Sequence, residues 1–380
     1  MTGMETAEGG TKRRAWQGIA TAVVALGALV ACTGEGPGGA RPAALGVANF
    51  SDLPGWQLDS QADALSALRR SCPRLVSGGG TRLSNAGGDV VTTAEEWRRA
   101  CAAAEPIARD DHRAARAYFE RYFQPMTVTG SGGDGRFTGY YEPEIRGSRV
   151  PSRRFTIPVY RRPPDLKADQ PYLTRTEIEN GALRGKGLEV AYVDDAIALF
   201  EMQVQGSGRV ALVEGGVLRL GYDGTNNRPY TALAKVLIDD GSLKSEEATW
   251  PGIRAWLQKN PAKAREVMRR NERYVFFKDT RGAGAVGAQG VALTSGRSMA
   301  VDPAFVPYGL PIYIDTSRPT PNRPGETTPL RRLMVGQDTG AAIKGPVRGD
   351  VFFGAGTAAA DSAGRMNSSG RWWILVPKKS

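Results

Sequence analysis

The sequence predicts an α+β fold that is mainly β, with its helices gathered in two stretches. Amphipathic helical patterns occupy residues 59–123, and a second helical stretch lies between residues 231 and 271. The rest consists of short segments rich in aromatic and β-branched residues, separated by Gly and Pro. Several short strands at this spacing are typical of a barrel or a sandwich.

The first 31 residues have the organisation of an export signal. Three basic residues at 12–14 precede AWQGIATAVVALGALVA, which is short for a bilayer-spanning helix of about 20 apolar residues. The tetrapeptide LVAC at 29–32 resembles a bacterial lipobox, so we expect residues 1–31 to be removed and Cys32 to be lipidated. An uncleaved anchor helix, or secretion with a free Cys32, are the alternatives, and both also export the chain.

A flexible tether and a first helix are expected next. Residues 32–50 form the predicted tether, because TGEGPGGARPAALG is small, polar and rich in Gly and Pro. Apolar residues at helical spacing then predict a helix from Asp59 to about Cys72, ended by Pro73.

Two more helices follow. Thr93 and Glu96 form a capping-box pattern that opens the second helix, which Pro106 bounds. The third begins at about Asp110, with His112 at its polar first turn. The glycine-rich GSGGDG at 130–135 is expected to be a turn, since its context does not match a phosphate-binding motif.

Strand-like segments dominate the remaining sequence. RFTGYYEPEI, FTIPVYRR and AIALFEMQVQGSGRVALVEGGVLRLGYDG are all predicted to form strands. After the helical stretch, YVFFKD, VALTSGRSMAVD, LPIYIDT, RRLMVGQDTG, GDVFFGAG and RWWILVPK return to short strands.

Composition limits the chemistry and the partners. The chain has 380 residues and a single histidine, His112, which excludes sites that need several imidazoles. A net charge of +11 favours anionic surfaces such as phospholipid headgroups or cell-wall polymers. The basic residues are spread along the chain, so nucleic acid is not an expected partner. In an oxidising compartment Cys72 and Cys101 could pair; two separate buried thiols are the alternative.

Three aspartates in the C-terminal strands are the remaining candidates for chemistry: Asp302, Asp338 and Asp350. The tripeptide DTG at 338–340 imitates an aspartic-protease signature, but no equivalent second aspartate exists. VQGSG at 204–208 lacks the first glycine of a serine-hydrolase elbow. Spacing alone does not choose among the aspartates, because Asp at a strand end often only caps backbone N–H groups.

The chain is similar to the membrane-bound lytic murein transglycosylase A family over about residues 137–376. The resemblance rests on FTGYYEPEI, PVYRRPP, MQVQGSGRV, NNRPYTALAKVLIDDG, NERYVFFK, GRSMAVDPAFVPYG and LMVGQDTGAAIKGPVRGDVFFGAG. It implies a double-psi β-barrel domain with a second β-rich domain inserted and a groove between them. The barrel would comprise residues 51–141 and 276–380, and the insert residues 142–275.

The resemblance also assigns roles to residues. Asp350 would be the catalytic acid and Asp338 its support. Substrate-binding residues would be Thr138, Tyr140, Gln205, Ser207, Gly208, Lys278, Asp302, Gly340 and Lys344. No metal and no organic cofactor are implied.

The expected activity is cleavage of the β-1,4 bond between N-acetylmuramic acid and N-acetylglucosamine in peptidoglycan, with 1,6-anhydromuramoyl ends as product. An inverting glycan hydrolase using two aspartates and a non-catalytic lipoprotein that binds the cell wall are the alternatives. We expect a monomer that is lipid-anchored at the periplasmic face of the outer membrane, with glycan strands as its partner.

Overall fold

The computed structural model describes residues 44–83, 88–129, 135–280, 282, 284–321, 323 and 325–379. The predicted signal segment, Cys32, the first part of the tether and most of the 130–135 turn lie outside this part of the chain. None of the helices described is long and apolar enough to cross a membrane.

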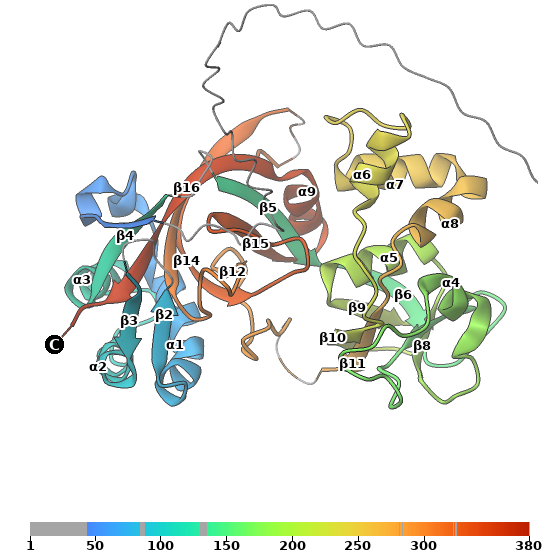
Figure 1. Cartoon of the computed structure of the whole chain (residues 1–380), viewed down its shortest axis with the longest axis horizontal. Helices are drawn as coiled ribbons and strands as arrows, with labels where there is room; N and C mark the ends of the chain where they lie inside the picture. The colour runs from blue at the N-terminus through green and yellow to red at the C-terminus, as the bar shows by residue number, and fades with distance from the viewer. Residues whose placement is uncertain are drawn as a thin grey trace, which may run out of the picture. The chain divides into compact units, whose positions relative to one another are not determined.

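An eight-stranded sheet forms the larger part of the fold, in the order β1-β4-β16-β13-β14-β12-β15-β5. An additional pairing between β16 and β5 closes six of these strands into a ring, so the predicted barrel is present (Figure 1). The strands are β1 (Ala44–Val47), β4 (Phe123–Thr129), β5 (Gly135–Glu142), β12 (Ser298–Ala300), β13 (Pro311–Pro319), β14 (Thr327–Asp338), β15 (Arg348–Ala355) and β16 (Asn367–Pro377).

The barrel strands contribute one continuous apolar core. Met299, Ile312, Val335 and Val351 are all buried within it. Ile374 on β16 pairs with Ile312 on β13, so the closing strand adds to the same core. Helix α9 (Thr357–Arg365) packs on β5 and β15. Burying this apolar surface is the main source of the barrel's stability.

Three helices pack on the barrel sheet: α1 (Gln61–Ser77), α2 (Ala94–Ala104) and α3 (His112–Tyr122). Thr93 and Glu96 form the predicted capping box of α2. His112 begins α3, as predicted. A short hairpin of β2 (Gly80–Leu83) and β3 (Val90–Thr93), which the sequence analysis did not predict, connects α1 to α2.

The prediction that Pro73 ends the first helix is wrong, because α1 continues through it to Ser77. Proline removes one backbone hydrogen bond and disfavours a helix interior. Here Leu68, Cys72 and Leu75 keep one face of the helix buried on both sides of the proline. Tertiary packing therefore outweighs the local preference of the residue.

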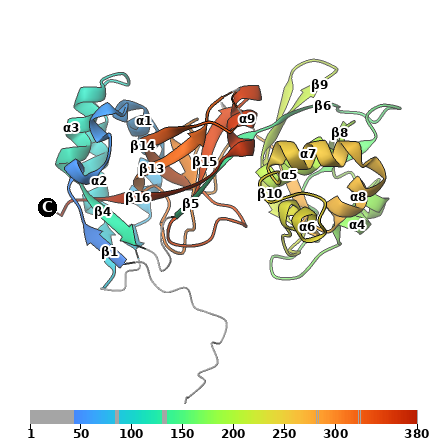
Figure 2. The same ribbon diagram turned by 90° about the horizontal axis from the view of Figure 1, so that it is seen from above.

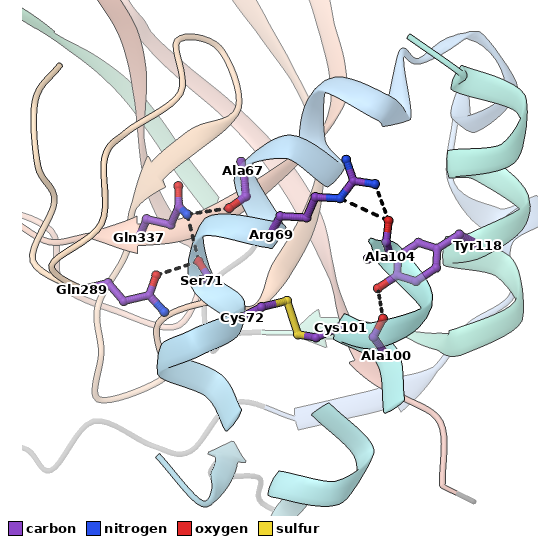
Figure 3. Close-up of a disulfide and its surroundings, with 10 residues drawn as sticks. All are labelled: Ala67, Arg69, Ser71, Cys72, Ala100, Cys101, Ala104, Tyr118, Gln289 and Gln337. Carbon is purple, nitrogen blue, oxygen red and sulfur yellow. Dashed lines mark hydrogen bonds between the residues drawn. A yellow bond between two sulfur atoms is a disulfide. The ribbon is translucent and has the colours of Figure 1, made fainter. Parts of the chain in front are cut away.

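A disulfide joins Cys72 of α1 to Cys101 of α2, with 5.8 Å between their Cα atoms (Figure 3). Of the two possibilities that the sequence left open, the structure has the paired form. Two hydrogen bonds reinforce this helical layer: Arg69 Nε donates to the Ala104 carbonyl at 3.1 Å, and the Tyr118 hydroxyl donates to the Ala100 carbonyl at 2.9 Å.

A second, six-stranded sheet in the order β11-β10-β9-β6-β8-β7 forms the insert. Figure 2 shows α6, α7 and α8 gathered beside α5 in this unit. The strands are β6 (Glu144–Ser148), β7 (Ile157–Tyr160), β8 (Glu189–Val193), β9 (Gly208–Leu212), β10 (Val217–Thr225) and β11 (Val275–Asp279). The helices are α4 (Arg175–Glu177), which continues into the turn η3 (Ile178–Ala182), α5 (Ala196–Gln205), α6 (Leu233–Asp239), α7 (Trp250–Lys259) and α8 (Pro261–Arg269).

Two predicted boundaries need correction. Residues 44–47 of the expected tether form β1 and pair with β4, and residues 50–52 form a helical turn, so composition alone made the tether too long. The expected return to the barrel at residue 276 cuts through β11, which pairs with β10 of the insert as far as Asp279.

The strand predicted at residues 196–205 is also wrong, because this segment forms helix α5. An apolar run such as AIALF does not distinguish a buried strand from a buried helix. The ends decide the outcome: Asp195 accepts hydrogen bonds from the Ile197 and Ala198 amides, and Gly206 ends the helix with a left-handed φ of 80°.

Replacing both Cys72 and Cys101 with Ser should lower the free energy of unfolding by about 2–4 kcal/mol, because the cross-link restricts the unfolded chain. Urea unfolding with and without a reductant measures the effect. The reduced wild type should match the variant, and the variant should not respond to the reductant. Equal midpoints for the oxidised wild type and the variant would contradict a stabilising role.

Candidate active site

The pairing of β5 with β15 brings Thr138 and Asp350 together. The two strands run parallel with these residues in register, and the Thr138 hydroxyl donates to Asp350 Oδ1 at 2.5 Å. Glycines permit the close packing around them. A Cβ on Gly349 would lie 2.6 Å from Met299 Sδ, and one on Gly139 would lie 2.6 Å from the Phe353 ring. Side chains at 139 and 349 would therefore disturb the strand that presents Asp350.

Arg348 fixes the direction of the Thr138 hydroxyl. It precedes Asp350 by two residues, which places both side chains on one face of β15. Its Nη2 donates to Thr138 Oγ1 at 2.9 Å. Because the threonine oxygen accepts this bond and has only one proton, that proton is committed to Asp350 Oδ1. No residue that the structure describes donates a hydrogen bond to the other carboxyl oxygen of Asp350, Oδ2.

Burial dominates the electrostatics of Asp350. Protein atoms surround the carboxyl although part of the residue remains accessible to solvent, and this desolvation raises the pKa of Asp350 above its ordinary value. The positive charge of Arg348 and the hydrogen bond from Thr138 lower the pKa, and the nearby charge of Asp338 raises it. The net direction is upward, so the carboxyl holds a proton to a higher pH than a free aspartate does.

Asp338, at the end of β14, has a different environment. Its carboxyl accepts hydrogen bonds from the Tyr140 hydroxyl at 2.8 Å, the Ala288 amide at 2.9 Å and its neighbour's amide at Thr339, also at 2.9 Å. Burial raises the pKa of Asp338 although these three bonds oppose the rise. Burial and the same carboxyl raise the pKa of Tyr140 well above its usual value. Asp338 thus holds in place the Tyr140 side chain and the loop that contains Ala288.

Asp302 organises the loop that leads into β15. It is buried, and its carboxyl accepts the Gly345 amide at 2.9 Å and the Ala304 amide at 3.2 Å. Lys344 is exposed, with its Nζ 3.8 Å from Asp302. Gly340 lies partly exposed at the start of the same loop. These contacts suit a structural role for Asp302.

The other predicted binding residues lie in the insert. Gln205 ends α5, and its Oε1 accepts the Tyr141 amide of β5 at 3.0 Å. Ser207 is buried in the following turn. A Cβ on Gly208 would lie 2.5 Å from Met202 Cε, so a side chain at this position would clash with Met202. Lys278 is exposed on β11 with its Nζ 3.9 Å from Asp223.

Arg348 and Tyr230 also lie close enough to Asp350 to interact with its charge, and neither was predicted as a site residue from the sequence. After burial, the charge of Asp350 is the largest cause of a raised pKa at Tyr230, so this insert residue lies within electrostatic range of the carboxyl. Tyr230 belongs to the segment NNRPYTALAKVLIDDG, which was already part of the resemblance. Arg348 is two positions from Asp350, and strand periodicity could have identified it.

A buried amide supports the site from behind. Gln337 Nε2 donates to the Ala67 carbonyl at 2.9 Å and to Ser71 Oγ at 2.8 Å, both on α1 (Figure 3). The Ser71 hydroxyl donates to the side-chain oxygen of Gln289, Oε1, at 2.7 Å. The backbone N–H of Gln289 donates to the backbone carbonyl of Gln337 at 3.1 Å. This network ties the residue before Asp338, and the loop that binds Asp338, to α1.

These contacts place two desolvated carboxyls, Asp338 and Asp350, on strands of the barrel, and the insert separates the two parts of the barrel in the sequence. Among the residues described, no group of three or more His, Cys, Asp or Glu side chains could hold a metal ion. A carboxyl with a raised pKa and one uncommitted oxygen is suited to donating a proton and taking one back.

Comparisons with known proteins agree with this class of site. The "MltA specific insert domain" matches residues 136–278 and the "3D domain" matches residues 297–376. The membrane-bound lytic murein transglycosylase A of Escherichia coli K12 is 34% identical over 316 residues, covering 83% of this chain and 80% of that protein. The chain therefore belongs to the membrane-bound lytic murein transglycosylase A family.

Solved structures give the same result. The lytic transglycosylase LtgG of Burkholderia pseudomallei is 42% identical, with a TM-score of 0.60, covering 90% of this chain and 100% of that one. Escherichia coli MltA with bound chitohexaose is 28% identical, with a TM-score of 0.67, covering 90% and 96%.

Replacing Asp350 with Asn should stabilise the protein at about pH 8 and have a much smaller effect near pH 4. Near the ordinary aspartate pKa of 3.8 about half of the unfolded chains still hold this proton, so ionisation separates the folded and unfolded states far less than at pH 8. As the pH rises, the unfolded state releases its proton freely while burial penalises the charge in the folded state. The wild type therefore loses stability that the variant keeps.

Thermal unfolding of both proteins at the two pH values measures this difference. Asp239→Asn is the matched control, because that carboxylate is exposed and only pairs with Lys235 on the surface. A stabilisation of the same size at both pH values would show that the buried charge is not its cause.

Proposed function

We propose that the protein is a peptidoglycan lytic transglycosylase in which Asp350 alone serves as acid and then as base. Membership of the family supports the activity. The observation that carries the assignment to Asp350 is its hydrogen bonding: Oδ1 accepts a bond from Thr138, and Oδ2 accepts none from the described part of the chain. Burial raises the pKa of Asp350 above its ordinary value, which favours the protonated form that an acid requires.

In the proposed reaction, Asp350 Oδ2 donates its proton to the glycosidic oxygen between N-acetylmuramic acid and N-acetylglucosamine. The bond from the anomeric carbon to that oxygen breaks, and the 6-hydroxyl oxygen of the same muramic acid bonds to the anomeric carbon. The ionised Asp350 takes the hydroxyl proton. No water is consumed, and the product carries a 1,6-anhydro ring. The tethered hydroxyl gains the advantage of proximity that an intramolecular nucleophile has.

The bonding of Asp338 argues against the hydrolytic alternative. An inverting glycosidase needs a second carboxylate that is free to activate a water molecule. Asp338 is engaged by three donors and is mostly buried. We assign it to positioning Tyr140 and the adjoining loop. A protein that only bound the cell wall would not need a desolvated carboxyl opposite Thr138.

For the substrate, we propose that Thr138, Tyr140 and Tyr230 contact the sugars near the reacting bond. Gln205, Ser207, Gly208, Lys278, Gly340 and Lys344 are proposed to contact units further along the strand. The bound chitohexaose of the Escherichia coli relative, an oligosaccharide, supports a site of this kind. We propose that Asp302 does not contact the sugars but holds the loop that precedes β15 in place.

For its location, we propose that Cys32 is lipidated after removal of residues 1–31. The mature protein would then be anchored, as a monomer, at the periplasmic face of the outer membrane. Relatives named as membrane-bound support attachment to a membrane.

Asp350→Ala should abolish release of 1,6-anhydromuropeptides from purified murein and leave glycan binding intact. Mass spectrometry of the products is the measurement, because hydrolysis adds one water and transglycosylation adds none. Asp338→Asn should reduce the rate without changing the product. Activity that persists in Asp350→Ala would refute its role, and products one water heavier would favour the hydrolase.

Arg348→Gln should move the alkaline limb of kcat/KM to higher pH. The arginine charge lowers the pKa of Asp350, so removing it raises that pKa and keeps the acid protonated longer. Arg136→Gln is the control, since it removes the same charge from an exposed neighbour on β5. If the alkaline limb of kcat/KM stays in place in Arg348→Gln, or moves to lower pH, the ionisation of Asp350 does not determine that limb.

A further inference from the structure

Two arginines lie side by side next to the reacting carboxyl. Arg136 on β5 is in register with Arg348 on β15, and the Arg348 guanidinium donates to the Arg136 carbonyl at 3.5 Å. Two positions further along the same strands, Thr138 is in register with Asp350. Because side chains alternate along a strand, the arginines share a face with these two residues, and about 7 Å of strand separates the two pairs. Arg136 is also exposed to solvent.

No acidic side chain in the described part of the chain forms an ion pair with either arginine. Their side-chain hydrogen bonds go to Asn367, to Thr138 and to backbone carbonyls. Desolvation lowers the pKa of Arg348, the charge of Asp350 opposes this, and the charge of Arg136 lowers the pKa further. The acid form of Asp350 is neutral, so in that form it gives the two positive charges no counter-charge. Two like charges held together in this way are stabilised by an anion.

Asn367 holds the Arg136 guanidinium without neutralising it. Asn367 begins β16, opposite Thr138 in the pairing of β16 with β5, and its Oδ1 accepts the Arg136 Nε–H at 2.9 Å. The two terminal nitrogens of Arg136, Nη1 and Nη2, donate to none of the residues described. They form a planar fork, a geometry that can bind both oxygens of a carboxylate. Arg136 is thus oriented through one nitrogen and has two left for a ligand.

Arg348 has a different task. Its Nη1 donates to the Gly349 carbonyl at 2.6 Å and its Nη2 to Thr138 Oγ1 at 2.9 Å, so both terminal nitrogens are already engaged. It contributes positive charge, whereas Arg136 contributes the hydrogen-bonding fork. Hydrogen bonds between an arginine and a carboxylate are roughly twice as strong as those between neutral groups. The pair therefore favours a carboxylate over a neutral hydroxyl group.

The substrate of the proposed reaction carries such a group. N-acetylmuramic acid differs from N-acetylglucosamine by a lactyl ether. Its carboxyl group is either free or linked to a stem peptide that ends in a carboxylate of its own. We propose that Arg136, oriented by Asn367, binds a carboxylate carried by the muramic acid whose bond is cut. The anion site follows from the arginine pair, and the choice of ligand rests on the proposed function.

This contact would set the register of the glycan strand. Muramic acid is every second sugar of the strand, so only every second position presents a carboxylate to Arg136. A chitin oligomer consists of N-acetylglucosamine alone and presents none. The site would thus help to place a muramic acid, and not its neighbour, at Asp350.

The test compares kcat/KM for release of 1,6-anhydro products from three forms of purified murein glycan. One form keeps its stem peptides, one has had them removed by an amidase, and in the third the freed carboxyl groups are blocked as methylamides. Arg136→Gln should lower kcat/KM about tenfold on a carboxylate-bearing form, as expected for one charge-assisted hydrogen bond, and leave it unchanged on the blocked form. Arg136→Lys keeps the charge but not the fork, so it should restore part of the loss.

The two charged forms distinguish the sources of the carboxylate. A loss of kcat/KM on the stem-free form identifies the lactyl group, and a loss confined to the stem-bearing form identifies the peptide; either result supports the site. Asn367→Ala should lower kcat/KM about threefold on the same form, because Arg136 keeps its charge but loses its orientation. Arg153→Gln is the matched control, since this arginine is exposed in the loop after β6 of the insert. It should behave as the wild type on all three forms.

Thermal unfolding establishes that each variant is folded. The alkaline limb of kcat/KM should keep its position in Arg136→Gln, because the arginine whose charge lowers the pKa of Asp350 is Arg348. An equal loss on the blocked form would show that Arg136 does not act on a carboxylate, and would overturn the proposal. So would an unchanged kcat/KM on both charged forms.

Binding separates this site from the reaction. Asp350→Ala, which should bind glycan without cutting it, is titrated by calorimetry with the stem-bearing, stem-free and blocked glycans, with and without Arg136→Gln. If a charged glycan binds more tightly through Arg136 but the wild type releases no 1,6-anhydro product, the proposed function is refuted and the carboxylate site is not. Normal release without that difference in binding would do the opposite.

Discussion

The parallel pairing of β5 with β15 is the constraint on which the rest of the structure depends. It sets Thr138 opposite Asp350, and successive residues of β5 then serve different parts of the molecule. Tyr140 binds Asp338, the Tyr141 hydroxyl donates to Glu201 of α5 at 2.5 Å, and Glu142 pairs with Arg209 of β9 at 2.7 Å. Because side chains alternate along a strand, a slip of one residue would displace all of these contacts together.

The same pairing places the two aspartates where ionisation of their carboxyls lowers the stability of the folded protein. Protein atoms surround both carboxyls although each residue is partly accessible to solvent, and this desolvation opposes their ionised forms. The three hydrogen bonds to Asp338 offset part of the desolvation of its carboxylate. Asp350 Oδ2 accepts no such bond from the residues described. The Gln337 network consists of neutral amide and hydroxyl groups, so it ties the site to the disulfide-linked helix α1 without itself adding charge next to Asp338. The packing of the barrel thus compensates for the destabilising effect of the desolvated Asp350 carboxyl.

Some features were predictable from the sequence because their determinants are local. The caps at Thr93 and Asp195 act within one turn, although only the first was recognised as a helix start. The aspartates were identified as a group, and the resemblance distinguished Asp350 from Asp338. The proximity of Tyr230 to Asp350, the continuation of α1 through Pro73 and the pairing of β1 depend on distant contacts that no local pattern contains.

Strand β16 has a consequence for how the molecule is made. It pairs with β4, β5 and β13, and it supplies the closing contact of the ring. Thr138 and Asp350 are separated by 212 positions in sequence, with the whole insert between them. Such non-local contacts form late, after more local units have folded. A chain still emerging from the ribosome would therefore have its insert strands complete but no closed barrel. An enzyme that cuts the wall around its own cell would thus remain without its active site until synthesis had passed residue 377.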